Sequence, residues 1–384
     1  MKIENKILKA IQKITKKRNL PLHEPVFFGN EKKYLNDCVD STFVSSKGDY
    51  VKKFEKLLEK YTNVKNVILV NSGTSALHIA LHAMNIKVED EVILPSMTFV
   101  ATANAIKYCN ATPHFVDSEE GTLGMDPIAL ERWLKKIVIK KGNYSFNKYT
   151  NKRISAIVPM HTFGHPCKIN ELIKIAREYN LKLIEDAAES LGSFYNGKHV
   201  GGFGNIGILS FNGNKTITTG AGGAILTNNT KQANQIRHII STAKLKHPYE
   251  YIHDNVGYNY RMPNLNASIG LAQLENINKI IKNKRNLYFL YKELFSNIDE
   301  IDLFKEPPNC KSNYWLQTII LKKQNKKLRN NILIHTNQKQ IMTRPVWKLL
   351  HKLKPFKDCP KSPLPKAMSL ENRIINIPSS YGLT

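Results

Sequence analysis

The feature that most constrains this chain is a regular alternation of short apolar runs and helical patterns between residues 67 and 227. The apolar runs span 67–70, 91–95, 111–117, 154–160, 181–186, 207–211 and 223–227. Between them, segments such as TSALHIALHAMN (74–85) repeat apolar residues at intervals of three and four. Strands that alternate with helices are typical of a mostly parallel sheet covered on both faces. We therefore predict an α/β fold whose large domain contains a mostly parallel seven-stranded sheet.

The 384 residues exceed one ordinary domain of roughly 100–200 residues. We predict a smaller α/β domain after the large one, and we expect an amphipathic N-terminal helix to pack with this small domain. The predicted parts are an N-terminal helical segment (1–40), a large domain (41–255) and a small C-terminal domain (256–384).

Three further segments have readable patterns. Residues 50–62 predict an amphipathic helix, and one long helix is expected after GYNYRMPNLNASIG (257–270), ending at about residue 295. The polar insert 140–153 is expected to form a surface loop or hairpin.

The net charge of +26 results from 57 Lys and Arg against 31 Asp and Glu. The basic residues are spread along the chain without a basic-aromatic motif, so a nucleic-acid-binding protein is disfavoured, and the positive field suits an anionic small substrate. The five cysteines include no CxxC pair, as expected of thiols in a reducing cytoplasm. No apolar run reaches the roughly 18–20 residues that span a bilayer, and the N-terminus lacks the apolar core of a secretory signal. We expect a cytoplasmic protein without membrane contact.

Two groups of potential metal ligands do not form a recognisable site. His78 and His82 are four residues apart on a predicted helix, but the glutamate of an HExxH motif is missing. His161, His165 and Cys167 lie on a strand-to-loop segment without a second pair of ligands. We predict no metal.

Ligands of open α/β sheets bind beyond the carboxyl ends of the strands. The first unusual strand end is VILVNSGTS (67–75), where Gly73 turns the chain into a helix. Free N–H groups at the helix start and the Thr74 hydroxyl make a pocket for an anion. A helix start capped by Ser or Thr explains the same residues at least as simply. The stretch does not match the GxxxxGK[ST] loop of nucleoside-triphosphate hydrolases.

Two other strand ends carry ionisable residues. LKLIED (181–186) ends in Glu185 and Asp186, which point to opposite faces, and a buried carboxylate requires a partner. SFNGNK (210–215) places Lys215 just past a strand among small residues, where partial desolvation would favour the neutral, nucleophilic amine. Solvated loop residues are the alternative explanation for both stretches.

One ligand would use all three strand ends. It needs a phosphate for the helix start, a basic ring nitrogen for a carboxylate and an aldehyde for a lysine. Pyridoxal phosphate has these three groups, and it is held in enzymes by a lysine Schiff base and an aspartate at the ring nitrogen.

The motifs also resemble a known family. The sequence is similar to the pyridoxal phosphate-dependent nucleotide-sugar aminotransferases of the DegT/StrS group, which have the fold type I aminotransferase architecture. The resemblance covers nearly the whole chain and is most specific in NSGTSALHIAL (71–81), IEDAAESLGSFYNGKHVGGFG (184–204) and SFNGNKTITTGAGGAILTN (210–228). Sugar dehydratases of this group have a histidine where this chain has Lys215, so the lysine indicates amination.

The resemblance implies a role for individual residues. Lys215 would form the Schiff base, Asp186 would hold the ring nitrogen protonated, and Glu189 would lie near the 3-oxygen of the ring. Gly73, Thr74 and Ser210 would bind the phosphate, and Phe99 would stack on the ring. Asn259 would reach the phosphate from the neighbouring subunit, which implies a homodimer with shared active sites. L-Glutamate is the expected amino donor.

The substrate is expected from resemblance alone. HTFGHPCKI (161–169) and STAKLKHPYEYIHDNVGYNYRMPN (241–264) look most similar to aminotransferases of the legionaminic-acid pathway, which aminate C4 of a UDP-linked 4-keto-6-deoxy-N-acetylhexosamine. Aminotransferases of the GDP-perosamine or bacillosamine type are the alternatives. Candidates to contact the diphosphate and base are Lys244, Lys246, His247, Arg261, Arg344 and Trp347, each of which could equally serve in a structural contact.

Overall fold

The computed structural model describes residues 2–14 and 19–383, and its main sheet confirms the predicted α/β fold. Seven strands of this nine-stranded sheet follow the order β1-β11-β10-β7-β6-β2-β3. They are β1 (Asn66–Val70), β2 (Glu91–Pro95), β3 (Thr112–Val116), β6 (Arg153–Ile157), β7 (Lys182–Asp186), β10 (Ile206–Ser210) and β11 (Gly223–Thr227). Each of them overlaps one of the seven apolar runs.

The direction of the strands places their ends at a common edge. Strands β10, β7, β6, β2 and β3 pair in parallel, whereas β11 is antiparallel to both β10 and β1. The carboxyl ends of the parallel strands therefore meet the start of β11, where Gly223 pairs with Ser210 and with Val70.

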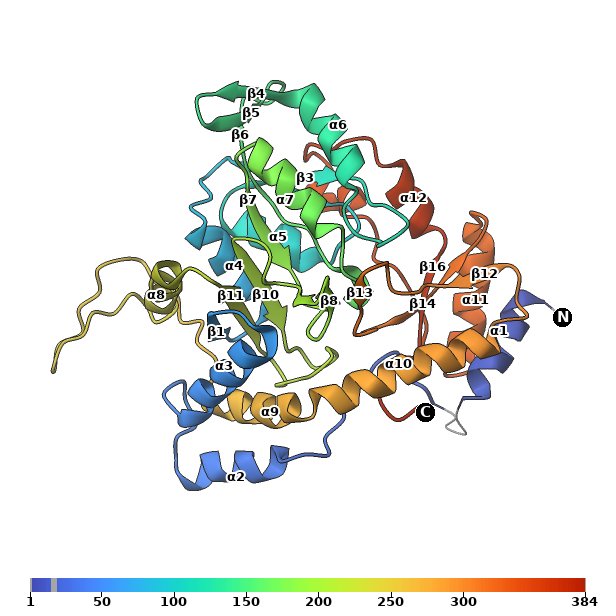
Figure 1. Cartoon of the computed structure of the whole chain (residues 1–384), viewed down its shortest axis with the longest axis horizontal. Coiled ribbons are helices and arrows are strands. Elements are labelled where there is room, and N and C mark those ends of the chain that lie inside the picture. Colours follow the sequence, from blue (N-terminus) through green and yellow to red (C-terminus); the bar gives the residue numbers. More distant parts are fainter. Residues whose placement is uncertain (1, 15–18, 384) are drawn as a thin grey trace.

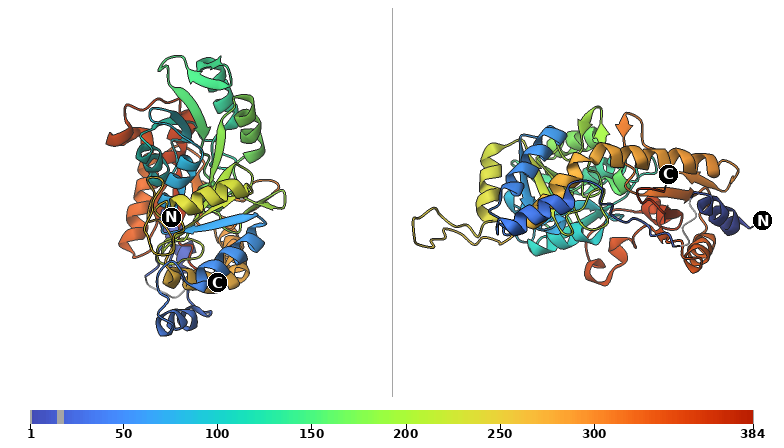
Figure 2. Two further views of the ribbon diagram at one scale, coloured as in Figure 1. Left: turned by 90° about the vertical axis from the view of Figure 1, so that its left-hand side faces the viewer. Right: turned by 90° about the horizontal axis from the view of Figure 1, so that it is seen from below.

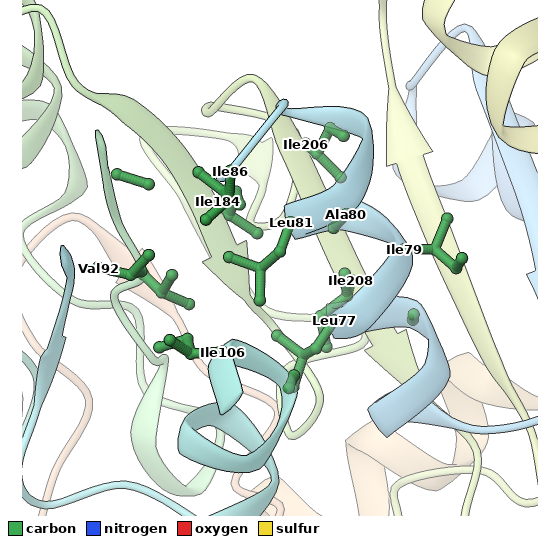
Figure 3. Close-up of a cluster of buried hydrophobic side chains, with 14 of the residues drawn as sticks. Leu77, Ile79, Ala80, Leu81, Ile86, Val92, Ile106, Ile184, Ile206 and Ile208 are labelled. Atoms are coloured by element: carbon green, nitrogen blue, oxygen red, sulfur yellow. The ribbon is translucent and has the colours of Figure 1, made fainter. Parts of the chain in front are cut away.

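Helices cover both faces of this sheet, because their apolar residues recur with helical spacing (Figure 1). One face is covered by α4 (Gly73–Ala83), α5 (Val100–Tyr108) and α8 (Thr230–Ile239). The other is covered by α3 (Asp49–Thr62), α6 (Pro127–Ile137), α7 (Ile169–Glu178) and α9 (Asn264–Glu275). Figure 3 shows Leu77 and Leu81 of α4 among Ile184 of β7 and Ile208 of β10.

A second sheet of four strands forms the right-hand part of Figure 1. Its order is β12 (Ile301–Leu303), β14 (Gln317–Leu321), β16 (Ile374–Ile377) and β15 (Arg344–Pro345). The N-terminal helix α1 (Ile3–Gln12) buries Ile7 and Ile11 against this part of the chain, as its amphipathic pattern suggests. The helices α11 (Lys326–Gln338) and α12 (Pro365–Glu371) also belong to it, while α2 (Glu31–Asp40) packs on α9. The domain limits at residues 40 and 255 stay predictions.

The single long helix expected to end at about residue 295 is in fact two helices, α9 and α10 (Ile277–Leu294). Asn276 separates them with φ −107° and ψ 6°, and its side-chain amide donates to the carbonyl of Ala272 at 3.2 Å. An asparagine side chain competes with the helical backbone for hydrogen bonds, which explains the break.

The polar insert forms the hairpin β4 (Val138–Lys141) and β5 (Tyr144–Asn147), which confirms one of the two expected forms. Strand β5 pairs with β6, so the hairpin extends the main sheet. A separate sheet of three short strands joins β13 (Cys310–Lys311) to β8 (Phe194–Tyr195) and β9 (Lys198–His199).

Residues 244–256, called the arm below, project from the body of the molecule after α8 (Figures 1 and 2). Tyr249 and Tyr251 are each 81% exposed and Val256 is 79% exposed, so the arm leaves large apolar side chains in solvent. None of the helices in the described part of the chain is long and apolar enough to cross a membrane.

Candidate active site

A cavity of about 330 Å³ lies at the edge where the parallel strands end. It brings together eight of the residues predicted from the sequence, although they come from distant parts of the chain. These are Gly73, Thr74, Phe99, Asp186, Glu189, Ser210, Lys215 and Trp347.

The start of α4 forms one wall of the cavity. The Ser72 hydroxyl caps the helix by accepting from the N–H of Ser75 at 3.0 Å, whereas the first-turn N–H groups of Gly73 and Thr74 have no acceptor within the helix. The wall is tightly built, because a Cβ atom added to Gly73 would lie 2.8 Å from Cβ of Ser210. Only glycine allows the helix start and the end of β10 to approach so closely.

Asp186 lies at the end of β7 and is 2% exposed. Its Oδ2 accepts from the Thr102 hydroxyl at 2.7 Å, and its Oδ1 accepts from the N–H of Ala188 at 3.2 Å. Burial raises the pKa of Asp186, and these hydrogen bonds and the charge of Lys215 offset only part of that rise. A cationic group in the cavity would favour the carboxylate form.

Lys215 follows β10 and is 12% exposed at its side chain. Its Nζ donates to Oε1 of Glu189 at 3.2 Å, while Oε2 of Glu189 accepts from the N–H of Phe163 at 2.9 Å. Burial raises the pKa of Glu189 to about 7, even though Lys215 and Phe163 favour its charged form. The cavity thus holds an amine, a carboxyl group able to exchange a proton near neutral pH, and the carboxyl of Asp186.

Two buried residues at this site were missed by sequence reasoning. Trp315 is 4% exposed, and its ring centroid lies 4.2 Å from Nζ of Lys215. Asn313 is fully buried and donates through its amide to the carbonyls of Glu189 and Leu191, both at 2.9 Å. Both lie in a connection before β14, more than ninety residues after Lys215 in the chain, where no local pattern signals a site.

Thr102 was also missed, although it stands within the stretch LPSMTFVATANAI (94–106) that resembles the family. It lies in the first turn of α5, and its hydroxyl donates to Oδ2 of Asp186. Phe99, just before α5, lines the cavity, with its ring centroid 6.2 Å from that of Trp347.

The two adjacent acids of β7 have different partners, as their opposite directions predict. Glu185 accepts from the N–H groups of Phe203 and Gly204 at 2.6 Å, and its Oε2 lies 3.1 Å from Nε2 of His161. Burial by itself would raise the pKa of Glu185, but these contacts lower it. Glu185 therefore holds the loop after β9, and Asp186 faces the cavity.

The other predicted substrate residues lie outside this cavity. Lys244, Lys246, His247 and Arg261 surround a second, more open cavity of about 940 Å³ at the base of the arm, together with Lys47. Arg344 is exposed on β15 and donates to Oδ1 of Asn337 at 3.2 Å. Asn259 is exposed and pairs through its backbone with Ser241.

Three of the histidines considered as metal ligands contact aromatic or hydroxyl side chains. The rings of His78 and His82 face Tyr258 edge-on, and Nδ1 of His165 lies 2.9 Å from the Ser312 hydroxyl. Among residues 2–14 and 19–383, no three His, Cys, Asp or Glu side chains form a group that could hold a metal ion.

Comparison with known proteins identifies the family. The DegT/DnrJ/EryC1/StrS aminotransferase family matches residues 28–384. The chain belongs to this family. It is a pyridoxal phosphate-dependent aminotransferase with the fold type I architecture, as predicted from its motifs.

Three relatives and one solved structure illustrate the similarity, and two of the relatives have names that state their product. The GDP-perosamine synthase of Escherichia coli O157:H7 is 40% identical over 95% of this chain and 94% of that protein. The GDP-perosamine synthase of Vibrio cholerae is 37% identical over 95% of each chain. EpsN of Bacillus subtilis, described as a pyridoxal phosphate-dependent aminotransferase, is 36% identical over 87% of this chain and 83% of its own. A crystal structure of a family member from Brucella abortus has a TM-score of 0.81 at 26% identity, covering 91% of this chain and 90% of that one.

Proposed function

We propose that this protein transfers an amino group from L-glutamate to C4 of a GDP-linked 4-keto-6-deoxy sugar, with pyridoxal phosphate held at Lys215. The observation that carries the proposal is the convergence of Lys215, Asp186 and the start of α4 on one cavity. Perosamine is a 4-amino-6-deoxy sugar, and the names of the two synthases favour a GDP-linked substrate. The relatives thus support the alternative weighed from the sequence rather than the UDP-linked sugar of the legionaminic-acid pathway.

The cavity suits the three groups of pyridoxal phosphate. The unpaired N–H groups of Gly73 and Thr74, beside the Ser210 hydroxyl, suit a phosphate, because the first turn of a helix attracts anions. Asp186 suits a protonated ring nitrogen, and Lys215 suits the aldehyde. Asp186 and Lys215 both line the cavity, as a cofactor bound between them requires.

Pyridoxal phosphate, when bound, supplies an electrophilic aldehyde and a cationic ring that accepts the electron pair released at the substrate carbon. Asp186 would keep the ring nitrogen protonated, held in place by Thr102 and Ala188. Nζ of Lys215 would carry the proton released at Cα of the amino donor to the aldehyde carbon of the cofactor, and would carry a proton the opposite way when the keto-sugar is aminated. Glu189, 3.2 Å from that amine, would hold Lys215 in reach and act near the 3-oxygen of the ring. The exchange of donor and acceptor predicts ping-pong kinetics.

We extend the proposal to a homodimer with shared active sites. The support is that the basic residues Lys244, His247 and Arg261 line the second cavity at the base of the exposed arm instead of lying beside Lys215. Asn259 is exposed and pairs with Ser241 of the same cavity. In a dimer, the arm of one subunit would bring these side chains to the cavity of the other, where arginine and lysine suit a diphosphate. The five cysteines are all free, in keeping with the cytoplasmic location expected for the enzyme.

Shared sites can be tested by mixing two inactive variants. Lys215→Ala and Asn259→Ala should each have low activity as homodimers. After mixed refolding, a heterodimer would contain one site with neither change, so activity should return to about a quarter of the parent value if subunits pair at random. Activity that stays at the level of the unmixed variants would contradict the shared site.

The cofactor and the substrate require separate measurements. Borohydride reduction of the protein loaded with pyridoxal phosphate, followed by peptide mass spectrometry, should place the label on Lys215. A label on another lysine would overturn the proposal. Turnover of GDP- and UDP-linked 4-keto-6-deoxy sugars under the same conditions should favour the GDP-linked sugar, and a preference for the UDP-linked one would restore the first expectation.

A further inference from the structure

Lys215 has a second neighbour besides Glu189. Its Nζ lies 4.2 Å from the ring centroid of Trp315 and 3.2 Å from Oε1 of Glu189. A cation over the face of an indole ring is attracted by the electrons of the ring, more strongly where water is excluded. Trp315 is 4% exposed, so this contact is largely shielded from solvent.

Trp315 also holds the backbone of the lysine loop. Its Nε1–H donates to the carbonyl of Asn214, the residue before Lys215, at 2.7 Å. The ring therefore contacts both ends of the lysine: the amine through its face and the adjacent backbone through its edge.

The position of Trp315 is itself fixed by Asn313. The amide oxygen of Asn313 accepts from the N–H of Trp315 at 2.8 Å, and its amide nitrogen donates to the carbonyl of Glu189 and to the Thr216 hydroxyl. This one buried side chain thus joins the connection before β14 to the loops that carry Glu189 and Lys215.

We propose that Trp315 is a positioning residue that binds the amine of Lys215 once that amine, released from the cofactor, has taken up a proton, and holds it in reach of the reacting carbon. The inference rests on the proposed role of Lys215 as the lysine that carries the cofactor. Glu189 stabilises the same cation, but as a carboxyl group it also takes up protons near neutral pH. An indole ring does not titrate, so its attraction for the amine persists when Glu189 is protonated. Asp186 and His23 are two further titratable groups that interact electrostatically with Lys215.

The test uses the full chain after removal of the cofactor, because there the amine of Lys215 is free. Only a neutral amine reacts with acetic anhydride, and mass spectrometry measures the labelling of the peptide that contains Lys215. The labelling rate at about pH 7.5, divided by the limiting rate that the same peptide reaches at high pH when its amine is fully neutral, reports the neutral fraction and cancels differences in access. Loss of the ring should raise this ratio about two- to thirty-fold in Trp315→Leu.

Trp315→Phe is the matched variant. It loses the Nε1–H bond to Asn214, as Trp315→Leu does, but keeps an aromatic face, so its ratio should lie between those of the parent and the leucine variant. Trp347→Leu, which alters a second tryptophan of the same cavity, should leave the ratio unchanged. If circular dichroism shows that Trp315→Leu is unfolded, Trp315→Met serves as the variant without a ring.

Equal ratios for the phenylalanine and the non-aromatic variants would overturn the inference, because the ring face would then have no effect. This readout requires no bound cofactor and no turnover. Its failure can therefore be told apart from failure of the proposed function, which the site of borohydride labelling decides.

Discussion

Glu189 should make the stability of the cofactor-free chain depend on pH. Burial raises the pKa of its carboxyl group to about 7, against an ordinary value of 4.5, and the group is 2% exposed. The folded chain holds this proton more tightly than the unfolded chain does. The contribution of Glu189 to the free energy of unfolding is therefore complete below about pH 4.5 and is lost as the pH rises through 7. One pKa unit corresponds to about 1.36 kcal/mol, so the loss amounts to about 3 kcal/mol.

Glu189→Gln removes this titration without a large change in volume. We expect the free energy of unfolding of the parent, measured relative to that of the variant, to fall by about 3 kcal/mol between about pH 4.5 and about pH 8. Urea unfolding of both cofactor-free proteins across this range, followed by circular dichroism, measures the difference. The control Glu250→Gln alters a side chain that is 61% exposed and should follow the parent at every pH. If the free energies of unfolding of the parent and of Glu189→Gln change in parallel with pH, burial does not raise the pKa of Glu189 as the structure indicates, and the reasoning fails.

Two further substitutions test the walls of the cavity. Gly73→Ala would place a methyl group 2.8 Å from Cβ of Ser210 and should weaken pyridoxal phosphate binding at least about tenfold in a fluorescence titration. The control Gly213→Ala should bind the cofactor normally, because its added Cβ would lie 4.0 Å from the nearest atom. Thr102→Val removes the hydroxyl donor 2.7 Å from Asp186. A hydrogen bond to a charged group contributes about 1.5–3 kcal/mol, so kcat should fall about ten- to hundred-fold. An unchanged kcat would show that this hydroxyl does not support the carboxylate.

The sheet could be predicted from the sequence because its information is local. Each buried parallel strand is a short apolar run, and each covering helix repeats apolar residues at helical spacing, so the seven strands β1, β2, β3, β6, β7, β10 and β11 were recognisable before any contact was known. The parallel arrangement then requires the strand ends to share one edge. This is why Gly73, Asp186 and Lys215, chosen as residues after strands, meet in one cavity.

Local information did not extend to every element. The break between α9 and α10 depends on one asparagine side chain that bonds to its own helix, and the apolar spacing continues across it. The sequence also placed Lys244, His247, Arg261 and Arg344 near one ligand, whereas within one chain the first three lie around the base of the arm and Arg344 lies elsewhere. Where a side chain on a long connection comes to lie depends on which surfaces pack, and no neighbouring residue in the chain specifies that.

The sequence by itself determined the family, the seven strands of the main sheet and the lysine at position 215, since each of these is encoded by a contiguous stretch of residues. Only the tertiary structure decided that Trp315 and Asn313 stand beside that lysine. They are brought there because Trp315 packs in one buried cluster with Met97 and Phe163 of the loops that follow strands of the main sheet. Contacts between residues so far apart in the chain are set by burial and hydrogen bonding in the whole fold.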